Sequence, residues 1–154
     1  MSKQANKISV TKKISEVAED VYGKILKGKS PTMSTPVRSL NNIKYHVKVG
    51  YFEMLGKNKM RTLTVNTVKT FAQTLKMMSL SKELVDTDDM ATKREAYYIS
   101  KNWGKAGFSE QAESDTIMDD VEAMFGVNRE QLKFTPEEKG GDIAGKLFVI
   151  DKDS

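Results

Sequence analysis

The sequence of 154 residues contains no cysteine and a single histidine, His46. Without cysteine there are no disulfide bonds, no thiolate nucleophile and no cysteine-based metal site, and the composition suits a reducing compartment. One histidine cannot form a histidine cluster. We therefore expect no metal site built from this chain's own residues.

Long hydrophobic runs are also missing. No apolar stretch approaches the roughly 20 residues that span a bilayer, and the longest clean stretch near the C-terminus is residues 147–150. The N-terminus lacks a signal-peptide core. No segment fits the Gly-rich phosphate loop that ends in Lys-Ser or Lys-Thr, so ATP binding by this motif is excluded. We expect a soluble, cytoplasmic protein without a membrane partner.

Charge is distributed unevenly along the chain. Residues 1–70 carry 14 basic and 4 acidic side chains, a balance of +10, whereas residues 71–154 carry 11 and 17, a balance of −6. A basic half is typical of proteins that meet nucleic acid or an acidic partner, because lysines near phosphates release condensed counterions. The alternative is a lysine-rich surface that only aids solubility.

The first 35 residues form one predicted unit. Residues 1–12 are polar and expected to be mobile, and apolar side chains then recur at helical spacing from Ile14 to Leu26, before Gly28. This pattern predicts an amphipathic helix over residues 13–27, and the segment "KSPTMSTPVRS" after it predicts a linker. The helix either packs on its own domain or binds a partner chain.

Residues 36–154 form the second predicted unit. Apolar residues alternate from Ile43 to Tyr51, which predicts a strand, and "GKNK" predicts the turn into a second strand over residues 61–65. A helix is expected to start near Asn66 or Thr67. The acidic "DTDD" would cap another helix beginning close to Ala91.

A third helix is predicted over residues 110–125, ending at Gly126, with Ile117, Val121 and Phe125 in the core. Its acidic character argues against phosphate contacts along its whole length. Beyond it, Gly140 and Gly141 predict a turn and residues 147–150 a strand. The fold class is therefore α+β and mainly α, a winged helix-turn-helix with an N-terminal amphipathic helix and β-hairpins.

The stretch "TKREAYYISKNW" sets two tyrosines among cations. Residues four apart share a helix face, so Arg94 lies beside Tyr98, and Lys93 and Lys101 lie on either side of Tyr97. Neighbouring cations favour a phenolate and also hold a phosphate that the phenolate could attack. Taken alone, this spacing is also common on solvated helix faces.

This stretch, with "GFSEQAESDTIMDDVE", "NNIKYHVKVGYFEMLGK" and "GGDIAGKLFVID", resembles the DNA-cleavage module of the A subunit of topoisomerase VI, in the type IIB topoisomerase and meiotic double-strand-break transesterase family. The resemblance covers roughly residues 36–151. It implies a winged-helix domain like that of catabolite activator protein. It also implies a 5′-phosphotyrosyl link made by transesterification, with two protomers cutting one duplex.

The resemblance places the nucleophile on Tyr98 and an essential arginine on Arg94. Adjacent residues lie about 100° apart around a helix, so Tyr97 cannot point at the same phosphate and would pack on the domain. Candidate DNA contacts are Lys93, Arg94, Lys101 and Lys105.

Relatives continue into a Toprim domain that binds magnesium, and this chain stops at "DKDS". Asp151 and Asp153 are interpreted as solvated charge, so the chain is either a fragment or relies on a partner for the metal. The resemblance further implies an A2B2 assembly with an ATP-binding B subunit on double-stranded DNA, and a nucleoid location. The isolated chain is expected to be inactive.

Two rival functions stay open. One is a non-catalytic winged-helix DNA-binding protein, in which Tyr98 packs or touches phosphate. The other is an assembly module that recruits the ATPase subunit through residues 13–27.

Overall fold

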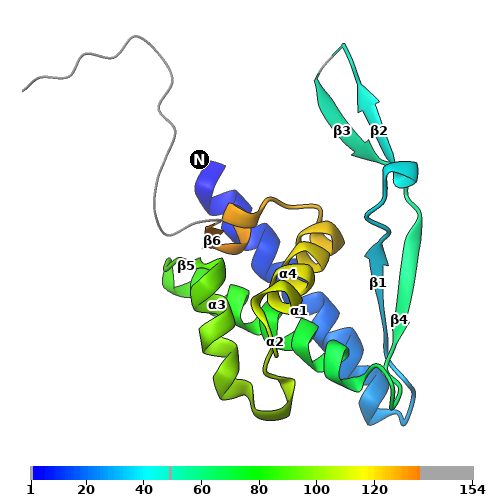
Figure 1. Ribbon diagram of the computed structural model, residues 1–154, viewed down its shortest axis with the longest axis vertical. Coiled ribbons are helices and arrows are strands. Elements are labelled where there is room, and N and C mark those ends of the chain that lie inside the picture. Colours follow the sequence, from blue (N-terminus) through cyan, green and yellow to red (C-terminus); the bar gives the residue numbers. More distant parts are fainter. Residues whose placement is uncertain (1, 49, 136–154) are drawn as a thin grey trace, which may run out of the picture.

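A computed structural model describes residues 2–48 and 50–135 as a helical body from which a narrow β-ribbon projects (Figure 1). The body is built from four α-helices, and the predicted α+β, mainly α class is confirmed. The α-helices are α1 (Ser2–Leu26), α2 (Val68–Thr87), α3 (Lys93–Ser100) and α4 (Gln111–Phe125). Short 3-10 turns are η1 (Leu40–Asn42), η2 (Lys101–Ala106) and η3 (Arg129–Leu132).

The ribbon, residues 32–62, consists of two strand pairs that follow one another from its base to its tip (Figure 1). At its base β1 (Thr32–Pro36) pairs antiparallel with β4 (Asn58–Thr62), and Met33 lies opposite Arg61. At its tip β2 (Ile43–His46) pairs antiparallel with β3 (Tyr51–Met54). A third, very short pair is parallel and joins β5 (Ala91–Thr92) to β6 (Phe134–Thr135) within the body.

The predicted linker after α1 is wrong, because its middle forms β1. Met33 and Thr35 are buried, and the strand gains its ladder hydrogen bonds from β4, which follows only after the whole tip of the ribbon. Pro36 is tolerated since it is the last residue of a two-stranded ladder and donates no bond there. The proline-based interpretation missed the distant partner strand.

The predicted hairpin has its turn in the wrong place. The alternating stretch splits after His46, where the Gly50 N–H donates to the His46 carbonyl at 2.8 Å and Gly50 takes a φ of +69° that favours glycine. The second strand, β4, begins at Asn58, within "GKNK", and pairs with β1 instead of with β2. A period of two therefore identified the strands but not their partners.

The helix predictions after the ribbon largely hold. α2 begins at Val68 after Thr67, and α4 ends at Phe125 before Gly126, whose φ of +59° closes the helix. The three residues of this helix that were predicted in the core are buried: Ile117, Val121 and Phe125. The cap of α3 is different from the predicted one, since Thr92 caps it while Asp88 ends α2 in the left-handed conformation.

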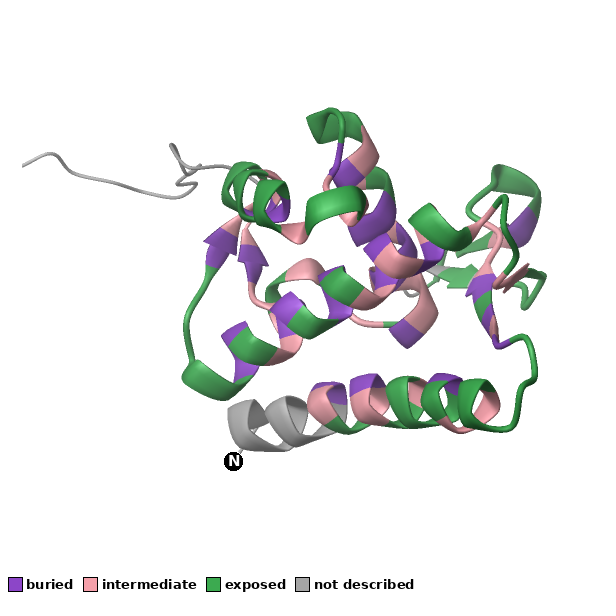
Figure 2. Ribbon diagram, turned by 90° about the horizontal axis from the view of Figure 1, so that it is seen from below, coloured by how far each residue is buried: buried purple, intermediate pink, exposed green. Residues whose placement is uncertain are grey.

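α1 lies along one side of the body with its buried residues facing the other helices (Figure 2). It begins at Ser2, earlier than the predicted residue 13. Val10, Ile14 and Val21 join the hydrophobic core, whereas Tyr22 and Leu26 are exposed. The apolar stripe of α1 is therefore docked on its own domain, except at its C-terminal end.

The wing predicted on Gly140, Gly141 and residues 147–150 lies outside the described residues, as do Asp151 and Asp153. The winged helix-turn-helix therefore stays a prediction. Within the described part, the three helices expected before the wing are present in the predicted order.

Candidate active site on the tyrosine helix

α3 is a helix of eight residues whose start is fixed by a capping box. The Glu95 N–H donates to Thr92 Oγ1 at 3.0 Å, and the Thr92 N–H donates to Glu95 Oε2 at 2.7 Å. Both bonds satisfy donors that a helix start would otherwise leave unpaired. The β5–β6 pair ties the residues just before the helix to Phe134 and Thr135.

Arg94 and Tyr98 meet on the outer face of α3. Arg94 Nε donates to the Tyr98 hydroxyl at 3.3 Å, and the guanidinium carbon lies 5.8 Å from the centre of the tyrosine ring. Tyr98 is 53% exposed. The predicted i, i+4 pair is therefore formed, and it places a permanent positive charge against the hydroxyl oxygen of a half-exposed tyrosine.

Tyr97 points in another direction and packs against the core. Its hydroxyl donates to the Ser109 carbonyl at 3.3 Å, and its ring lies 5.5 Å from that of Tyr98 at an interplanar angle of 47°. The packing expected for Tyr97 is confirmed. The two tyrosines thus differ in exposure although they are neighbours in the chain.

The predicted cations are held differently from one another. Lys101 Nζ donates to the Phe108 carbonyl at 2.7 Å and lies 4.1 Å from the Tyr97 ring centre. Lys93 Nζ turns toward α4, 3.4 Å from Asp115 Oδ2. Lys105 is exposed in η2. The structure therefore brings Arg94 to Tyr98 and directs Lys93 and Lys101 into contacts within the chain.

Comparison with known proteins identifies the family. The sequence profile described as "Type IIB DNA topoisomerase" matches residues 69–134, which include α3 and the whole of α4. The chain is 47% identical over 152 residues to a protein of Methanocaldococcus jannaschii named as the A subunit of type 2 DNA topoisomerase 6, covering 99% of this chain and 41% of that protein. The chain belongs to the type IIB DNA topoisomerase family.

Two other archaeal relatives carry the same name. The protein of Pyrococcus abyssi is 34% identical over 89% of this chain and 38% of its own length. That of Methanothermobacter thermautotrophicus is 30% identical over 92% and 40%. The chain thus spans about two fifths of the length of these topoisomerase A subunits.

Sequence reasoning missed Glu113, which accepts hydrogen bonds from the loop that follows η2 and from α2. Glu113 Oε2 accepts from the Ser109 N–H at 2.8 Å, and Oε1 accepts from Gln73 Nε2 at 2.9 Å. Burial opposes the charged carboxylate, but the hydrogen bonds from Ser109, Gln73 and Lys69 outweigh it, so the pKa of Glu113 is lowered. The sequence signal was a glutamate in the first turn of α4, where helix starts favour acids.

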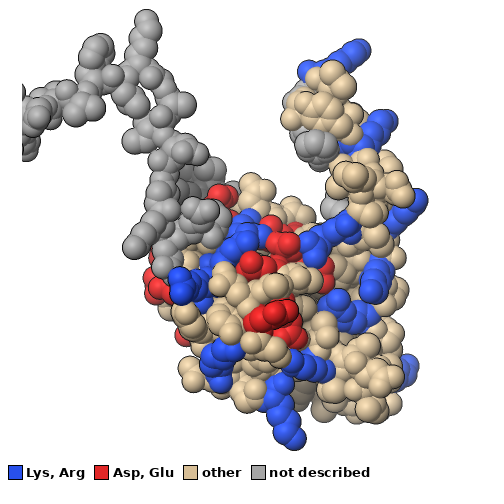
Figure 3. All heavy atoms as spheres, viewed as in Figure 1, with Lys and Arg blue, Asp and Glu red and all other residues tan. Residues whose placement is uncertain are grey.

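The acidic helix α4 is neutralised by basic residues from elsewhere in the chain. Figure 3 shows acidic side chains gathered on one face of the body with basic side chains around them. Arg38 Nε lies 3.0 Å from Asp120 Oδ1, and Arg61 Nη2 lies 3.3 Å from Asp120 Oδ2. Arg129 pairs with Asp119 and Glu122. Two of the basic residues among residues 1–70, Arg38 and Arg61, therefore form ion pairs with α4.

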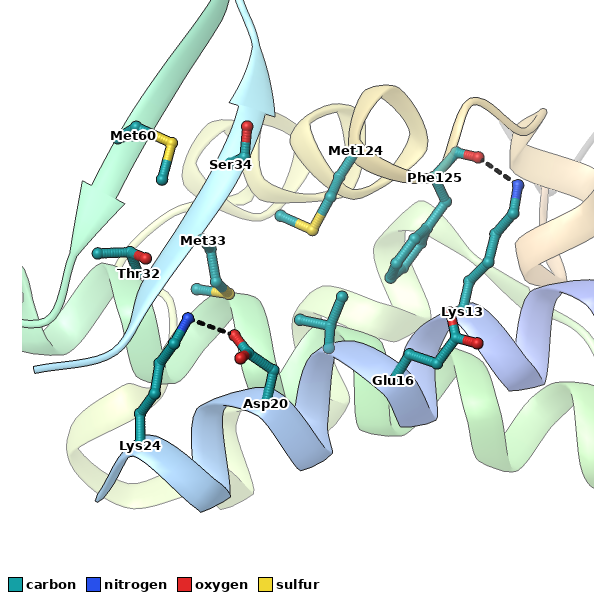
Figure 4. Close-up of a pocket in the computed structure, with 11 residues that line it drawn as sticks. Lys13, Glu16, Asp20, Lys24, Thr32, Met33, Ser34, Met60, Met124 and Phe125 are labelled. Atoms are coloured by element: carbon teal, nitrogen blue, oxygen red, sulfur yellow. Dashed lines mark hydrogen bonds and ion pairs between the residues drawn. The ribbon is translucent and has the colours of Figure 1, made fainter. Parts of the chain in front are cut away.

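A groove of about 620 Å³ lies between α1, the base of the ribbon and α4 (Figure 4). Its apolar lining includes Met33, Met60 and Met124, and its rim carries the Lys24–Asp20 ion pair at 2.6 Å. Lys13 Nζ crosses from α1 to the Phe125 carbonyl at 2.7 Å. These contacts show how α1 is joined to the rest of the body.

Residues 2–48 and 50–135 contain neither a metal-binding cluster nor a membrane-spanning helix. Within residues 2–48 and 50–135, no group of three or more acidic, histidine or cysteine side chains is placed to hold a metal ion. None of the helices in this same part is long and apolar enough to cross a membrane.

Proposed function

We propose that this chain is the DNA-cleaving part of the A subunit of a type IIB topoisomerase and that Tyr98 is its nucleophile. The observation that carries the proposal is the exposed Tyr98 hydroxyl, which accepts from Arg94 Nε at 3.3 Å in a chain of this family. The helix that carries both residues is firmly capped. A reactive tyrosine needs this combination of access, a neighbouring cation and a fixed direction.

The proposed reaction is a transesterification. The Tyr98 oxygen loses its proton and attacks a backbone phosphorus, forming a new oxygen–phosphorus bond. The bond from phosphorus to the 3′ oxygen breaks, and that oxygen takes up a proton. One phosphodiester replaces another, so no oxidant or reductant is needed. The 5′-phosphotyrosyl link can be reversed by the same 3′ hydroxyl, which explains rejoining of the strand.

Arg94 would stabilise the negative charge of the phosphate in this reaction. Its guanidinium contacts the hydroxyl oxygen, and its planar fork suits phosphate oxygens. We propose Arg94 and the exposed Lys105 as contacts to double-stranded DNA. The same role for Lys93 and Lys101 remains a prediction from sequence, since both ammonium groups already contact Asp115 and the Phe108 carbonyl.

The remaining parts of the enzyme are proposed from the family. Magnesium would be held by a Toprim domain outside the described residues, and ATP would be bound by a B subunit. The assembly would be A2B2 on chromosomal DNA in the cytoplasm. No reaction step is assigned to magnesium in this chain. We further propose that residues 36–154 form the cleavage domain and that residues 1–35 contact the B subunit, for which the exposed Tyr22 and Leu26 of α1 are available.

The test is to trap the covalent complex in an enzyme whose A subunit contains this chain, assembled with its ATPase partner. Tyr98→Phe is expected to abolish the protein–DNA adduct because it removes the attacking oxygen, while DNA binding stays nearly unchanged. Tyr97→Phe is the matched control and is expected to keep most of the adduct. Mass spectrometry of the trapped peptide identifies the linked residue.

A phosphotyrosine found on Tyr97 would contradict the assignment. DNA binding without any adduct, in an assembly that is active with its other parts, would favour the non-catalytic DNA-binding function. Loss of ATPase-subunit binding on removal of residues 1–30, with DNA binding intact, would support the contact proposed for residues 1–35. The same loss, together with no adduct from the intact assembly, would favour a role in assembly alone.

A further inference from the structure

The direction in which the Tyr98 hydroxyl points depends on contacts that other residues make between α3 and the rest of the domain. Among the described residues, the Tyr98 side chain contacts Arg94 and the Tyr97 ring, both on α3. Those contacts would rotate together with the helix. The residues that fix α3 to the body therefore contribute to the direction of Tyr98 relative to the rest of the domain.

Lys101 contacts both the Tyr97 ring of α3 and the loop that follows η2. Its ammonium group lies between the Tyr97 ring, 4.1 Å from the ring centre, and the Phe108 carbonyl, at 2.7 Å. The Tyr97 hydroxyl binds the next carbonyl, that of Ser109. Tyr97 of α3 and Lys101, the residue that follows α3, thus bind two consecutive carbonyls of one loop.

That loop is itself held rigidly. The Phe108 N–H donates to Ser100 Oγ at 3.3 Å, and a side chain at Gly107 would bring its Cβ within 2.9 Å of the Ser100 carbonyl oxygen. On its other side, the Ser109 N–H donates to Glu113 of α4. The loop therefore provides a fixed reference between α3 and α4.

We propose that Lys101 is a positioning residue that fixes the rotation of α3 and thereby the direction of Tyr98 and Arg94. Because side chains project about every 100° around a helix, a small rotation of α3 would move the Tyr98 oxygen away from a bound phosphate. This inference rests on the proposed function, since it concerns the placement of its nucleophile. It assigns Lys101 to the Tyr97 ring and the Phe108 carbonyl, and not to DNA.

The competing role, a direct phosphate contact, has a different signature. A lysine that neutralises one phosphate contributes about 0.9 to the slope of log affinity against log salt concentration. A positioning lysine contributes to the rate of adduct formation and leaves this slope unchanged. The two roles can therefore be separated by measuring DNA affinity at several salt concentrations and the adduct rate at saturating DNA.

The variant is Lys101→Met, which keeps an unbranched side chain and removes the charge. In the assembled enzyme, well below its melting temperature, we expect adduct formation to slow by about ten- to a hundredfold, with unchanged DNA affinity and salt slope. Lys101→Arg can still contact both the ring and the carbonyl, and is expected to restore most of the rate. Lys76→Met, an exposed lysine of α2, controls for loss of a surface charge.

A spectroscopic readout uses Trp103, the single tryptophan of the 154-residue chain. Its ring packs edge-on against Phe108 at a centroid distance of 5.6 Å, next to the carbonyl that Lys101 binds. Lys101→Met is expected to shift Trp103 emission to longer wavelength and to increase quenching by the neutral quencher acrylamide. Lys76→Met and Lys101→Arg are expected to leave both unchanged.

The outcomes are decisive in each direction. A salt slope lowered by about one in Lys101→Met, or an unchanged adduct rate, overturns the positioning role. A loss of rate without change in Trp103 emission also overturns it, because the loop would then be undisturbed. If Tyr98→Phe keeps its adduct in the same assay, the proposed function fails first, and this inference fails with it.

Discussion

The tyrosine helix and the ribbon are held in opposite ways. α3 is short, and it is braced by the loop at residues 107–109, by the cap at Thr92 and by the β5–β6 pair. The ribbon extends far from the body, and its tip pairs only β2 with β3 (Figure 1). The contacts of α3 suit a reaction that needs a fixed distance between the tyrosine and its target. The ribbon tip is held only by the pairing of its own strands.

The ribbon is nevertheless rigid at two points. At its base, Arg61 reaches Asp120 of α4. Midway, the fully buried Asn42 donates to the Val37 and Lys57 carbonyls at 2.8 and 2.9 Å and accepts from the Lys57 N–H at 2.9 Å. Leu40, two residues before Asn42, is 88% exposed, and Val47, just after β2, is 82% exposed. Order in the ribbon thus depends on a few polar contacts.

The largest effect is expected at the tyrosine helix. Arg94→Ala should lower the rate of adduct formation by about a hundredfold, or on the order of 3 kcal/mol, because charge that develops on the phosphate loses its guanidinium. DNA affinity should fall far less. The adduct rate at saturating DNA checks this, with Lys76→Met as the control. A rate close to that of the unaltered protein would show that the contact with Tyr98 is only structural.

In the ribbon, Asn42→Ala should reduce the free energy of unfolding by about 2 kcal/mol, because three hydrogen bonds of a buried side chain are lost and the Lys57 N–H loses its acceptor, Asn42 Oδ1. Chemical denaturation measures it. Asn41→Ala, at an exposed neighbouring position, is the matched control. Equal stability of the two variants would mean that the ribbon does not fold together with the body.

Glu113 tests the bracing of the loop through pH. Its pKa is lowered from the ordinary 4.5 in the folded protein, so its contribution to stability is present above that ordinary value and is lost as pH falls through the lower, folded value. Glu113→Gln should therefore cost about 1 kcal/mol at neutral pH and less in acid. Unfolding curves at pH 7 and in acid compare the two proteins. A constant difference at all pH values would contradict this assignment.

The smallest effect is expected at the tip of the ribbon. Val47→Ser should change the free energy of unfolding by no more than about 0.5 kcal/mol, since an exposed side chain has little buried surface to lose. Val21→Ser in α1, at a buried position, is the contrasting variant and should cost several times more. A large loss at Val47 would mean that the tip is covered in solution.

Local patterns in the sequence determined the helices and the central pair of the site. Helical spacing depends on neighbours three and four residues away, so it predicted α2, α4 and the meeting of Arg94 with Tyr98. The core position of Phe125 followed from the same periodicity. The reaction assigned to Tyr98 came from the family resemblance, since spacing alone is shared with ordinary helix surfaces.

Only the tertiary structure decided which distant segments meet. The pairing of β1 with β4, the use of Arg61 against Asp120 and the turn of Lys101 toward the Phe108 carbonyl all depend on chain folding between segments that no local period relates. A lysine beside a tyrosine looks the same in sequence whether it faces DNA or a carbonyl. Its partner is set by the position of the neighbouring loop, because hydrogen bonds act over about 3 Å.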